Sequence, residues 1–406
     1  MKTIILFMNS YPYSQSLEDT FIEPELEVLS KYYKIVIIPL TKKGNRSKFV
    51  NTLQNVEVYE DLDEFDKNKI FLYLKNIDRK LFKELKYINS KNHFINLLKY
   101  YLRYLWIKDN IKKLIKNNVL NKNYIYYTYW FDYTTTALCS LKEEFNLKVI
   151  TRTHGYDLYE ERRDGYIPFR KNDVKNIDKI VTISMRGFNY LKRRYNLQNL
   201  YNSYLGIKDL HIINPINNLN TFKIVSCSLM SPIKRINMIM EYLSNYSKKY
   251  NISIEWHHIG NGILENELKQ QKKKLQHNNF IINFVGFLEN KDIFEYYRKN
   301  SFDYFITLSA SEGLPVSLME ACSVGLPIIA TDVGGINEIV KNDINGFLLS
   351  ANPSFEEFEN ILTKAINLKK TIEKYKNMRE RSRNIFLENF NSDVNHKKFA
   401  EFLEML

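Results

Sequence analysis

The residues best suited to chemistry stand between Leu308 and Gly325, where a strand pattern changes into a helix pattern. An apolar strand ends at Leu308, a turn containing Gly313 follows, and Pro315 stands at a first helical position. The helix is expected to run to about Val324, where Gly325 ends it. At the carboxyl edge of a parallel sheet, the free N–H groups of residues 316–318 would bind an anion such as a phosphate or pyrophosphate. The residues expected around this anion are Gly313, Leu314, Pro315, Val316 and Ser317.

Two carboxylates flank this helix start, Glu312 in the loop and Glu320 on the helix. A carboxylate beside a phosphate repels it unless the carboxylate faces hydroxyl donors, for which it is a strong acceptor. The layout therefore predicts a ligand with a sugar at one end, a diphosphate in the middle and a ribose at the other end. The alternative is that Glu312 is a first-turn helix charge and Glu320 an ordinary exposed residue.

The N-terminal half carries a second set of polar residues after an apolar strand at 148–153. His154 follows that strand and precedes a glycine, so it is expected at the sheet edge where ligands bind, although a structural histidine is the alternative. Asp157 is either a ligand for a hydroxyl group or a helix-start carboxylate. Asp132 ends the preceding strand and is expected at the same sheet edge, as is Tyr13 in the loop 9–22.

The elements that must position these residues are predicted to be alternating strands and helices. The expected strands are mostly apolar throughout, which is typical of parallel strands buried on both faces, and hence of an α/β fold. They are 3–8, 34–40, 124–129, 148–153, 179–183, 223–227, 252–259, 280–285, 304–308, 327–330 and 347–349.

The pattern divides into two halves, each long enough for one doubly wound sheet. Residues 1–205 form the expected N-terminal domain, and 206–220, rich in asparagine around Pro215, an expected linker. Residues 221–385 form the expected C-terminal domain, and 386–406 a helix that packs back toward the N-terminal domain.

Composition excludes several protein classes. The chain has 406 residues, 44% hydrophobic and 26% charged, which argues against a disordered or coiled-coil protein. Its three cysteines, Cys139, Cys227 and Cys322, are too few and scattered for a disulfide scaffold or a cysteine metal site. No stretch reaches the roughly 20 apolar residues that span a bilayer. A cytoplasmic protein is expected, with peripheral attachment to the inner face of the plasma membrane as a further possibility.

The net charge of +13 is concentrated in one region, since residues 66–122 hold 15 Lys and Arg against 4 Asp and Glu. Apolar residues recur there at helical spacing, at Phe94, Leu97, Leu98, Tyr101, Leu102 and Leu105. One interpretation is a solvated helix packed on its own domain, and the other is a basic helix at an anionic membrane surface. The two interpretations are compatible, because the apolar stripe can be core while the basic face meets lipid.

The segment 309–321 resembles the motif of two glutamates, eight positions apart, of the retaining glycosyltransferases of family 4. The text at 325–330 and 332–336 matches too, as do 259–262 and 285–287 further upstream. The resemblance implies a GT-B fold, with two facing Rossmann-like domains and a deep cleft between them. It implies that the domain 1–205 binds the acceptor, with Asp157, Asp132 and Tyr13 on the acceptor side, and that the domain 221–385 binds the nucleotide sugar. It implies that Glu312 holds donor-sugar hydroxyls and that Glu320 holds the nucleotide ribose, with backbone near Gly286 contacting the base.

The same family usually has an arginine and, six residues later, a lysine after the first strand of the C-terminal domain. Lys234 fits the lysine, whereas Ser228 stands where the arginine is expected. Arg235 is adjacent to Lys234 and is the candidate for the missing cation, although neighbouring residues on a helix point apart.

The text at 151–159 resembles a block of a bacterial surface-polysaccharide branch of that family, in which the histidine lies near the reacting carbon. This implies a catalytic role for His154. The loop 9–22 resembles the Tyr-Pro to Phe-Ile stretch of the same branch but lacks the glycine pair of many relatives. Hydroxyls of Ser14, Ser16 and Thr20 are the alternative donors there.

The implied activity is sugar transfer of the hexosyltransferase type, with retention, from a UDP- or GDP-sugar to an acceptor hydroxyl. The acceptor is expected to be a glycan or lipid-linked glycan of bacterial surface polysaccharide biosynthesis. No metal and no cofactor beyond the donor substrate is expected, and nucleic acid is not an expected partner. The alternatives are a GT-B-fold sugar-nucleotide epimerase and a non-enzymatic basic protein that binds membranes or nucleic acid.

Overall fold

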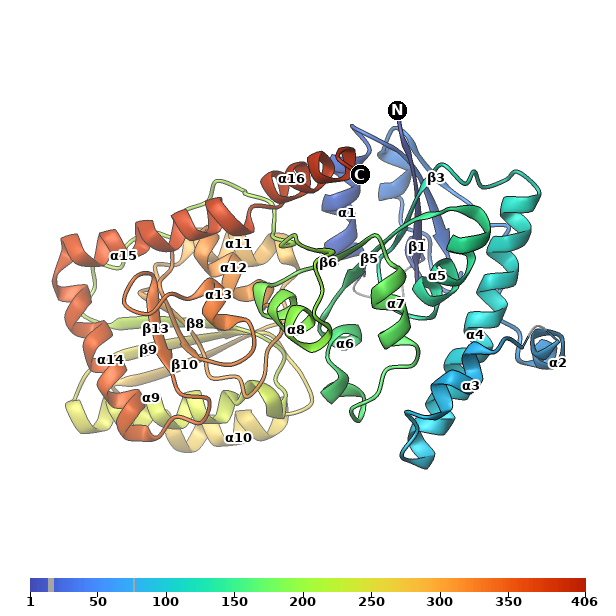
Figure 1. Cartoon of the computed structure of the whole chain (residues 1–406). Helices are drawn as coiled ribbons and strands as arrows, with labels where there is room; N and C mark the ends of the chain where they lie inside the picture. The colour runs from blue at the N-terminus through green and yellow to red at the C-terminus, as the bar shows by residue number, and fades with distance from the viewer. Residues whose placement is uncertain (14–17, 76) are drawn as a thin grey trace. The chain divides into compact units, whose positions relative to one another are not determined.

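The computed structural model of the protein describes residues 1–13, 18–75 and 77–406, without the side chains of Thr20 and Leu72 (Figure 1). The predicted hydroxyl donors Ser14 and Ser16, and the side chain of Thr20, therefore lie outside the described residues. The chain forms two compact units. Unit 1 comprises Met1–Leu205 and Asp393–Leu406, and unit 2 comprises Gly206–Ser392.

Unit 1 is built on a seven-stranded parallel sheet with the order β3-β2-β1-β4-β5-β6-β7. Strand order reverses between β1 and β4, which is where doubly wound sheets bind ligands beyond the carboxyl ends of their strands. The strands are β1 Thr3–Met8, β2 Lys34–Pro39, β3 Val56–Val58, β4 Ile125–Thr128, β5 Lys148–Thr153, β6 Lys179–Thr182 and β7 Leu200–Asn202.

Helices cover both faces of this sheet. Ile5 and Phe7 of β1 point into one apolar cluster, and Ile4 and Leu6 point into the other, as expected for strands buried on both faces. The helices are α1 Glu18–Leu29, α2 Ile70–Leu74, α3 Lys80–Leu85, α4 Lys91–Lys116, α5 Tyr133–Phe145, α6 Gly155–Leu158, α7 Arg170–Asn176, α8 Met185–Tyr195 and α16 Ser392–Glu404.

The long helix α4 corrects one detail of the predicted apolar stripe. Ser90 caps its N-terminus by accepting a hydrogen bond from the His93 amide at 3.1 Å. Leu97, Tyr101 and Leu105 are buried as predicted, whereas Phe94 and Leu98 are exposed. Four-residue steps along a helix drift around its axis, so a stripe read over several turns is wider than the face that is buried.

The C-terminal segment belongs to unit 1. Phe399, Ala400 and Leu403 of α16 lie in the same apolar cluster as α1, and the two helices lie side by side in Figure 1. The Tyr33 hydroxyl donates to the Ala400 carbonyl at 2.9 Å. The segment that joins unit 1 begins at Asp393, later than the expected 386, because the π-helical turn η5 Phe386–Phe390 still belongs to unit 2.

Unit 2 has a six-stranded parallel sheet with the order β10-β9-β8-β11-β12-β13, so its ligand-binding point lies between β8 and β11. Its strands are β8 Phe222–Cys227, β9 Ile254–Ile259, β10 Phe280–Gly286, β11 Tyr304–Thr307, β12 Ile328–Thr331 and β13 Gly346–Leu349. Its helices are α9 Ile236–Tyr250, α10 Glu265–Leu275, α11 Asn290–Lys299, α12 Val316–Ser323, α13 Ile336–Ile339, α14 Phe355–Lys370 and α15 Ile372–Ile385.

The prediction of two parallel-sheet α/β domains is confirmed, and the differences lie at the margins. The sequence missed β3 and β7, which are edge strands of 3 residues each and carry no long apolar run. The segment 206–220 is packed as part of unit 2, because Asn214 and Asn217 are buried and donate to Tyr297 O and Asp303 Oδ2 at 2.7 and 2.8 Å. Among the described residues, no helix combines the length and apolarity needed to cross a bilayer.

Candidate active site

The candidate site of unit 2 is formed by the loops that follow β8 and β11. These strands are neighbours in the sheet, and the Ala310 amide donates to the Ile233 carbonyl at 2.8 Å, which ties the two loops together. Lys234 ends the short 3-10 helix η4, Pro232–Lys234, and its ammonium lies 2.6 Å from Glu312 Oε1. The fold thus joins two residues, far apart in sequence, that were predicted to serve one ligand.

The Lys234–Glu312 pair is mostly shielded from water, with side chains 23% and 10% exposed. Each charge neutralises the other, so the region carries no net charge from this pair. A diphosphate would give Lys234 a second anion, and a sugar would give Glu312 hydroxyl donors. The pair therefore has the chemistry to exchange its mutual contact for contacts with a phosphorylated sugar.

Glycines hold the Glu312 loop in place. Gly334 has a φ of +62°, and a Cβ there would lie 1.9 Å from the Glu312 carbonyl oxygen. The next residue, Gly335, donates its amide to the Gly313 carbonyl at 2.7 Å. The glycine pair after β12 thus positions the Glu312 loop through backbone contacts.

A second pair of glycines holds the loop after β8. A Cβ on Gly260 would lie 2.0 Å from the Ser228 carbonyl oxygen, and one on Gly262 would lie 2.6 Å from that of Met230. The Met230 amide donates to the Asn261 carbonyl at 2.8 Å. The segment 259–262, which belongs to the text that resembles family 4, therefore shapes the loop that carries Lys234.

The helix α12 begins directly after the loop that follows β11 and carries Glu312. Pro315 precedes the first helical residue, Val316, so it lies one position earlier than predicted. The Leu318 amide donates to the Pro315 carbonyl at 3.2 Å and is not free, which corrects the prediction for that residue. Val316 and Ser317 are the first two residues of the helix, where amides lack partners within the helix. Gly313 and Leu314 lie in the preceding turn.

Glu320 is a buried carboxyl on α12 and not an ordinary exposed residue. Its Oε1 accepts a hydrogen bond from Asn290 Nδ2 at 3.1 Å, and burial raises the pKa of the carboxyl to about 7. Asn290 begins α11. Sequence reasoning missed Asn290, because only the strand order brings the start of α11 to this carboxyl.

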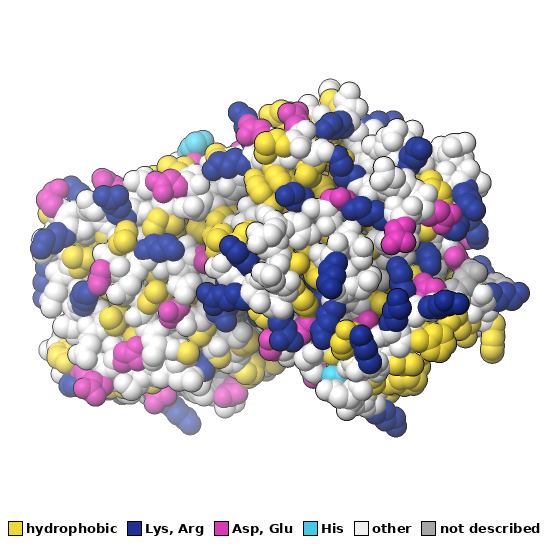
Figure 2. Space-filling view, in the orientation of Figure 1, with side chains coloured by type: hydrophobic (Ala, Val, Ile, Leu, Met, Phe, Trp, Pro, Cys, Tyr) yellow, Lys and Arg dark blue, Asp and Glu magenta, His cyan; other side chains and the backbone are white. Residues whose placement is uncertain are grey.

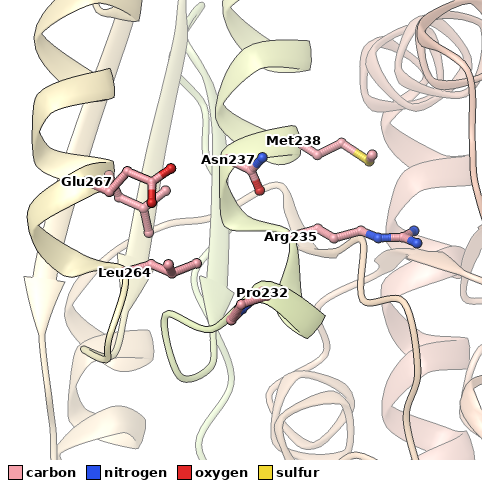
Figure 3. Close-up of a pocket in the computed structure, with 7 residues that line it drawn as sticks. Pro232, Arg235, Asn237, Met238, Leu264 and Glu267 are labelled. Atoms are coloured by element: carbon pink, nitrogen blue, oxygen red, sulfur yellow. The ribbon is translucent and has the colours of Figure 1, made fainter.

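Arg235 has other partners than a phosphate in this structure. Its guanidinium donates to the Ala351 carbonyl at 2.7 Å and to Asn352 Oδ1 at 2.6 Å. Arg235 stands at the start of α9 and lines a pocket of about 420 Å³. Figure 3 shows its side chain directed away from Glu267. The pocket is lined by Pro232, Arg235, Asn237, Met238, Leu264, Glu267 and Leu268. In this structure the Arg235 guanidinium is held by Ala351 and Asn352.

Two other predicted residues of unit 2 flank these loops. The Ser228 hydroxyl donates a long hydrogen bond of 3.5 Å to the Leu229 carbonyl. Gly286 ends β10 with a φ of +86° and accepts the Gly260 amide at 2.8 Å, and the space beside its Cα is open. The open backbone at Gly286 leaves room for a flat ligand group.

Unit 1 has its own cluster at the point where β1 and β4 reverse strand order. Glu18, the first residue of α1, accepts hydrogen bonds from the amides of Ser10 and Tyr11 at 3.1 and 3.0 Å. It also accepts one from Trp130 Nε1 at 2.6 Å. Sequence reasoning did not single out Glu18, which fixes the loop after β1 to the end of β4.

His154 lies next to this cluster. Its ring centroid is 4.4 Å from that of Trp130 and 5.0 Å from that of Tyr129. The imidazole is buried, and neither ring nitrogen makes a hydrogen bond with the described residues. Burial, assisted by the nearby Arg152, lowers the pKa of His154 to about 3, so the ring is neutral at ordinary pH.

The carboxylate of Asp157 has structural partners. Its Oδ1 accepts from the His154 amide and its Oδ2 from the Phe131 amide, at 2.5 and 2.7 Å. These contacts match the helix-start alternative and leave little of this buried group for an acceptor.

Asp132 caps α5 by accepting a hydrogen bond from the Thr134 amide at 2.9 Å, and burial raises the pKa of Asp132 to about 7. Tyr13 is half-buried, and its backbone pairs with that of Arg46 in an isolated antiparallel β-bridge.

A known protein family matches the part of the chain that carries the unit 2 site. Residues 211–385 match the family model of the glycosyl transferases group 1. Unit 2 carries a group 1 glycosyl transferase domain. The matched range contains Lys234, Glu312 and Glu320.

Relatives among curated proteins agree with that match. An uncharacterized glycosyltransferase of Haemophilus influenzae is 28% identical over 217 residues, covering 52% of this chain and 57% of the relative. The O-antigen biosynthesis glycosyltransferase WbnH of Escherichia coli is 32% identical over 136 residues, covering 31% and 36%. The similarity thus spans less than two thirds of each relative.

Solved structures show that the fold is GT-B. The lipopolysaccharide outer core galactosyltransferase WaaB superposes with a TM-score of 0.72 at 13% identity, covering 100% of both chains. HepE of Anabaena, solved in complex with UDP, superposes with a TM-score of 0.66 at 16% identity, again over 100% of both.

Proposed function

We propose that the protein transfers a sugar from a UDP- or GDP-sugar to an acceptor hydroxyl, with unit 2 binding the donor and unit 1 the acceptor. The observation that carries the proposal is the Lys234–Glu312 pair, which lies at the ligand-binding point of the unit 2 sheet. The start of α12 and the buried carboxyl of Glu320 complete a set with one group for each part of such a donor. The UDP bound by HepE supports the choice of donor class.

The leaving group of this reaction is a nucleoside diphosphate, on which negative charge develops. Lys234 and the amides of Val316 and Ser317 would stabilise that charge, each contributing on the order of 3 kcal/mol to lowering the barrier. Glu312 would accept hydrogen bonds from the sugar hydroxyls, and Glu320 from the ribose. Lys234 would leave Glu312 for the diphosphate as the donor binds.

The finer features follow the resemblance to family 4. The transfer is proposed to retain the anomeric configuration by front-face attack, in which the departing phosphate oxygen takes the proton of the acceptor hydroxyl. The neutral imidazole of His154 would accept or donate one hydrogen bond near the reacting carbon. No resident metal is proposed, since Lys234 and the helix start supply positive potential.

The acceptor is proposed to be a glycan or lipid-linked glycan of bacterial surface polysaccharide biosynthesis, met at the cytoplasmic face of the plasma membrane. WbnH, named for O-antigen biosynthesis, and WaaB, named for the lipopolysaccharide outer core, support this class. Asp132 and Tyr13 are the proposed acceptor-side residues, whereas Asp157 is proposed to position the loop after β5.

A thermal-shift screen tests the donor assignment. One of the UDP-, GDP- or ADP-sugars is expected to raise the melting temperature, because a ligand that binds only the folded state stabilises it by mass action. The shift is expected to persist with a chelator present. No shift with any of these would contradict the proposal, and rapid epimerisation of the donor without acceptor would favour an epimerase instead.

Glu320 is expected to make donor affinity depend on pH. Folding raises the pKa of this carboxyl from 4.5 to about 7, so ionising it costs stability, and its contribution to stability falls as pH rises through that window. The ionised form is the stronger acceptor for ribose hydroxyls, so donor affinity should increase as pH rises through 7. Calorimetric titration at several pH values measures this.

The control for this prediction is Glu320→Gln, which keeps the shape of the side chain but does not titrate. The pH dependence of affinity should disappear in that variant, and a dependence that persists would assign it to another group. The intact nucleotide sugar should be titrated, because the terminal phosphate of a free nucleoside diphosphate itself ionises near pH 6.

A further inference from the structure

An apolar ridge projects from unit 1 along α2, α3 and the first half of α4. Phe71 is 83% exposed and Phe82 66%. They are grouped with other exposed apolar side chains and not scattered singly over the surface. The other exposed apolar side chains of the ridge are Leu74, Ile77, Leu85, Phe94, Ile95 and Leu98. Figure 2 shows apolar side chains gathered over this region, with Lys and Arg around them.

The charges around the apolar ridge are almost all positive. Its exposed basic residues are Lys67, Lys69, Lys75, Arg79, Lys83, Lys86, Lys91, Lys99 and Arg103. None of them forms an ion pair with the described residues. A surface that combines exposed aromatics with unpaired cations is suited to an anionic partner that also has an apolar interior.

The two acidic residues within 67–103 are turned inward. Asp78 pairs with Lys108 at 3.1 Å and accepts the Tyr104 hydroxyl. Glu84 is buried and accepts the Tyr166 hydroxyl and the Phe169 amide at 3.0 and 2.9 Å. Their negative charges therefore serve the packing of α3 and α4 on unit 1, and do not offset the cations outside.

We propose that the apolar ridge inserts into an anionic lipid bilayer, with its lysines and arginines against the headgroups. Exposed Phe and Ile side chains gain by entering the acyl boundary, and each nearby cation is attracted to acidic lipid. The surface would hold unit 1 where a lipid-linked acceptor is found, and in that respect the inference rests on the proposed function. Bilayer binding itself needs no donor and no catalysis.

Charge favours a bilayer over the other occupants of such a surface. A second copy of the chain would bring like charges together around the ridge, which disfavours self-association. A nucleic acid would satisfy the cations but would leave protruding aliphatic side chains such as Ile77 and Ile95 without an apolar environment. An anionic bilayer accommodates both kinds of residue.

Co-sedimentation of the full chain with vesicles tests the inference. Binding is expected to phosphatidylcholine vesicles that contain phosphatidylglycerol, and to be at least tenfold weaker to phosphatidylcholine alone. The variant Phe71→Ser/Phe82→Ser/Phe94→Ser should weaken binding at least tenfold, as should Lys83→Glu/Lys86→Glu/Lys91→Glu. All six side chains are exposed, so the fold should be kept, which circular dichroism checks.

A matched control reverses the same number of lysines elsewhere, with Lys272→Glu/Lys273→Glu/Lys274→Glu on α10, and should leave vesicle binding within twofold of the parent. Equal loss in that control would overturn the inference in favour of net charge alone. Failure of the parent chain to bind anionic vesicles would overturn it, as would a dimer that only the ridge variants dissociate. Donor binding, measured in parallel, separates this outcome from failure of the proposed function.

Discussion

Replacing Lys234 by alanine is expected to lower kcat about a hundredfold, the typical effect of removing one preorganised group that stabilises developing charge. The Lys234 ammonium lies 2.6 Å from Glu312 Oε1. Lys234 ends the 3-10 helix η4 in the loop after β8, where its ammonium would meet the leaving diphosphate. Because this charge grows in the transition state, the loss should appear in kcat more than in KM. Steady-state kinetics with the donor found by thermal shift measures it.

The structure adds a control for the unpaired charge that this variant leaves behind. Glu312 is only 10% exposed, so Lys234→Ala strands a shielded carboxylate and should lower the melting temperature as well. In Lys234→Ala/Glu312→Gln the stranded charge is gone, so melting temperature should recover while turnover stays low. Near-parental kcat in Lys234→Ala would remove Lys234 from the proposed site, and near-parental kcat in Glu312→Ala would remove Glu312.

The second large effect is expected from Gly334→Ala, which changes a residue that makes no proposed contact with substrate. Its Cβ would lie 1.9 Å from the Glu312 carbonyl oxygen, and its φ of +62° strains any side chain. The Glu312 loop must move, and a misplacement of about 1 Å in a catalytic group can cost about a hundredfold in rate. Turnover per folded molecule should therefore fall at least tenfold.

Gly346→Ala is the matched control for this glycine. Its Cβ would lie 2.0 Å from the Ile328 carbonyl oxygen, an equally severe clash, but at the amino ends of β13 and β12 and thus at the opposite sheet edge from the site. Both variants should lower the melting temperature, and only Gly334→Ala should lower turnover of the folded fraction. Equal losses in both would mean that Gly334 acts through stability alone.

The sequence predicted those parts of the site whose residues are close along the chain. The strand, turn and helix around Glu312 are local, and the mostly apolar strands predicted a parallel sheet. The partners of the predicted residues were not predictable. The Lys234–Glu312 pair and the Trp130–Glu18 hydrogen bond depend on strand order, which joins the loops after β8 and β11 and those after β1 and β4.

The direction in which a side chain points was also not predictable from the sequence. The sequence offered Arg235 as a substitute cation, and the contacts of its guanidinium with Ala351 and Asn352 became known only from the structure. Asp157 stood with two open interpretations until its hydrogen bonds with the Phe131 and His154 amides were known. A residue type and a position in a motif do not determine which neighbour a side chain meets.

The C-terminal segment Asp393–Leu406 has a consequence for how the chain is made. Unit 1 contains both the first residues and this last segment, with all of unit 2 inserted between them. During synthesis from the N-terminus, the side of unit 1 that receives Phe399 and Leu403 stays uncovered until unit 2 has been translated. Unit 1 can therefore be completed only after unit 2 has been translated, and unit 2 can fold before it.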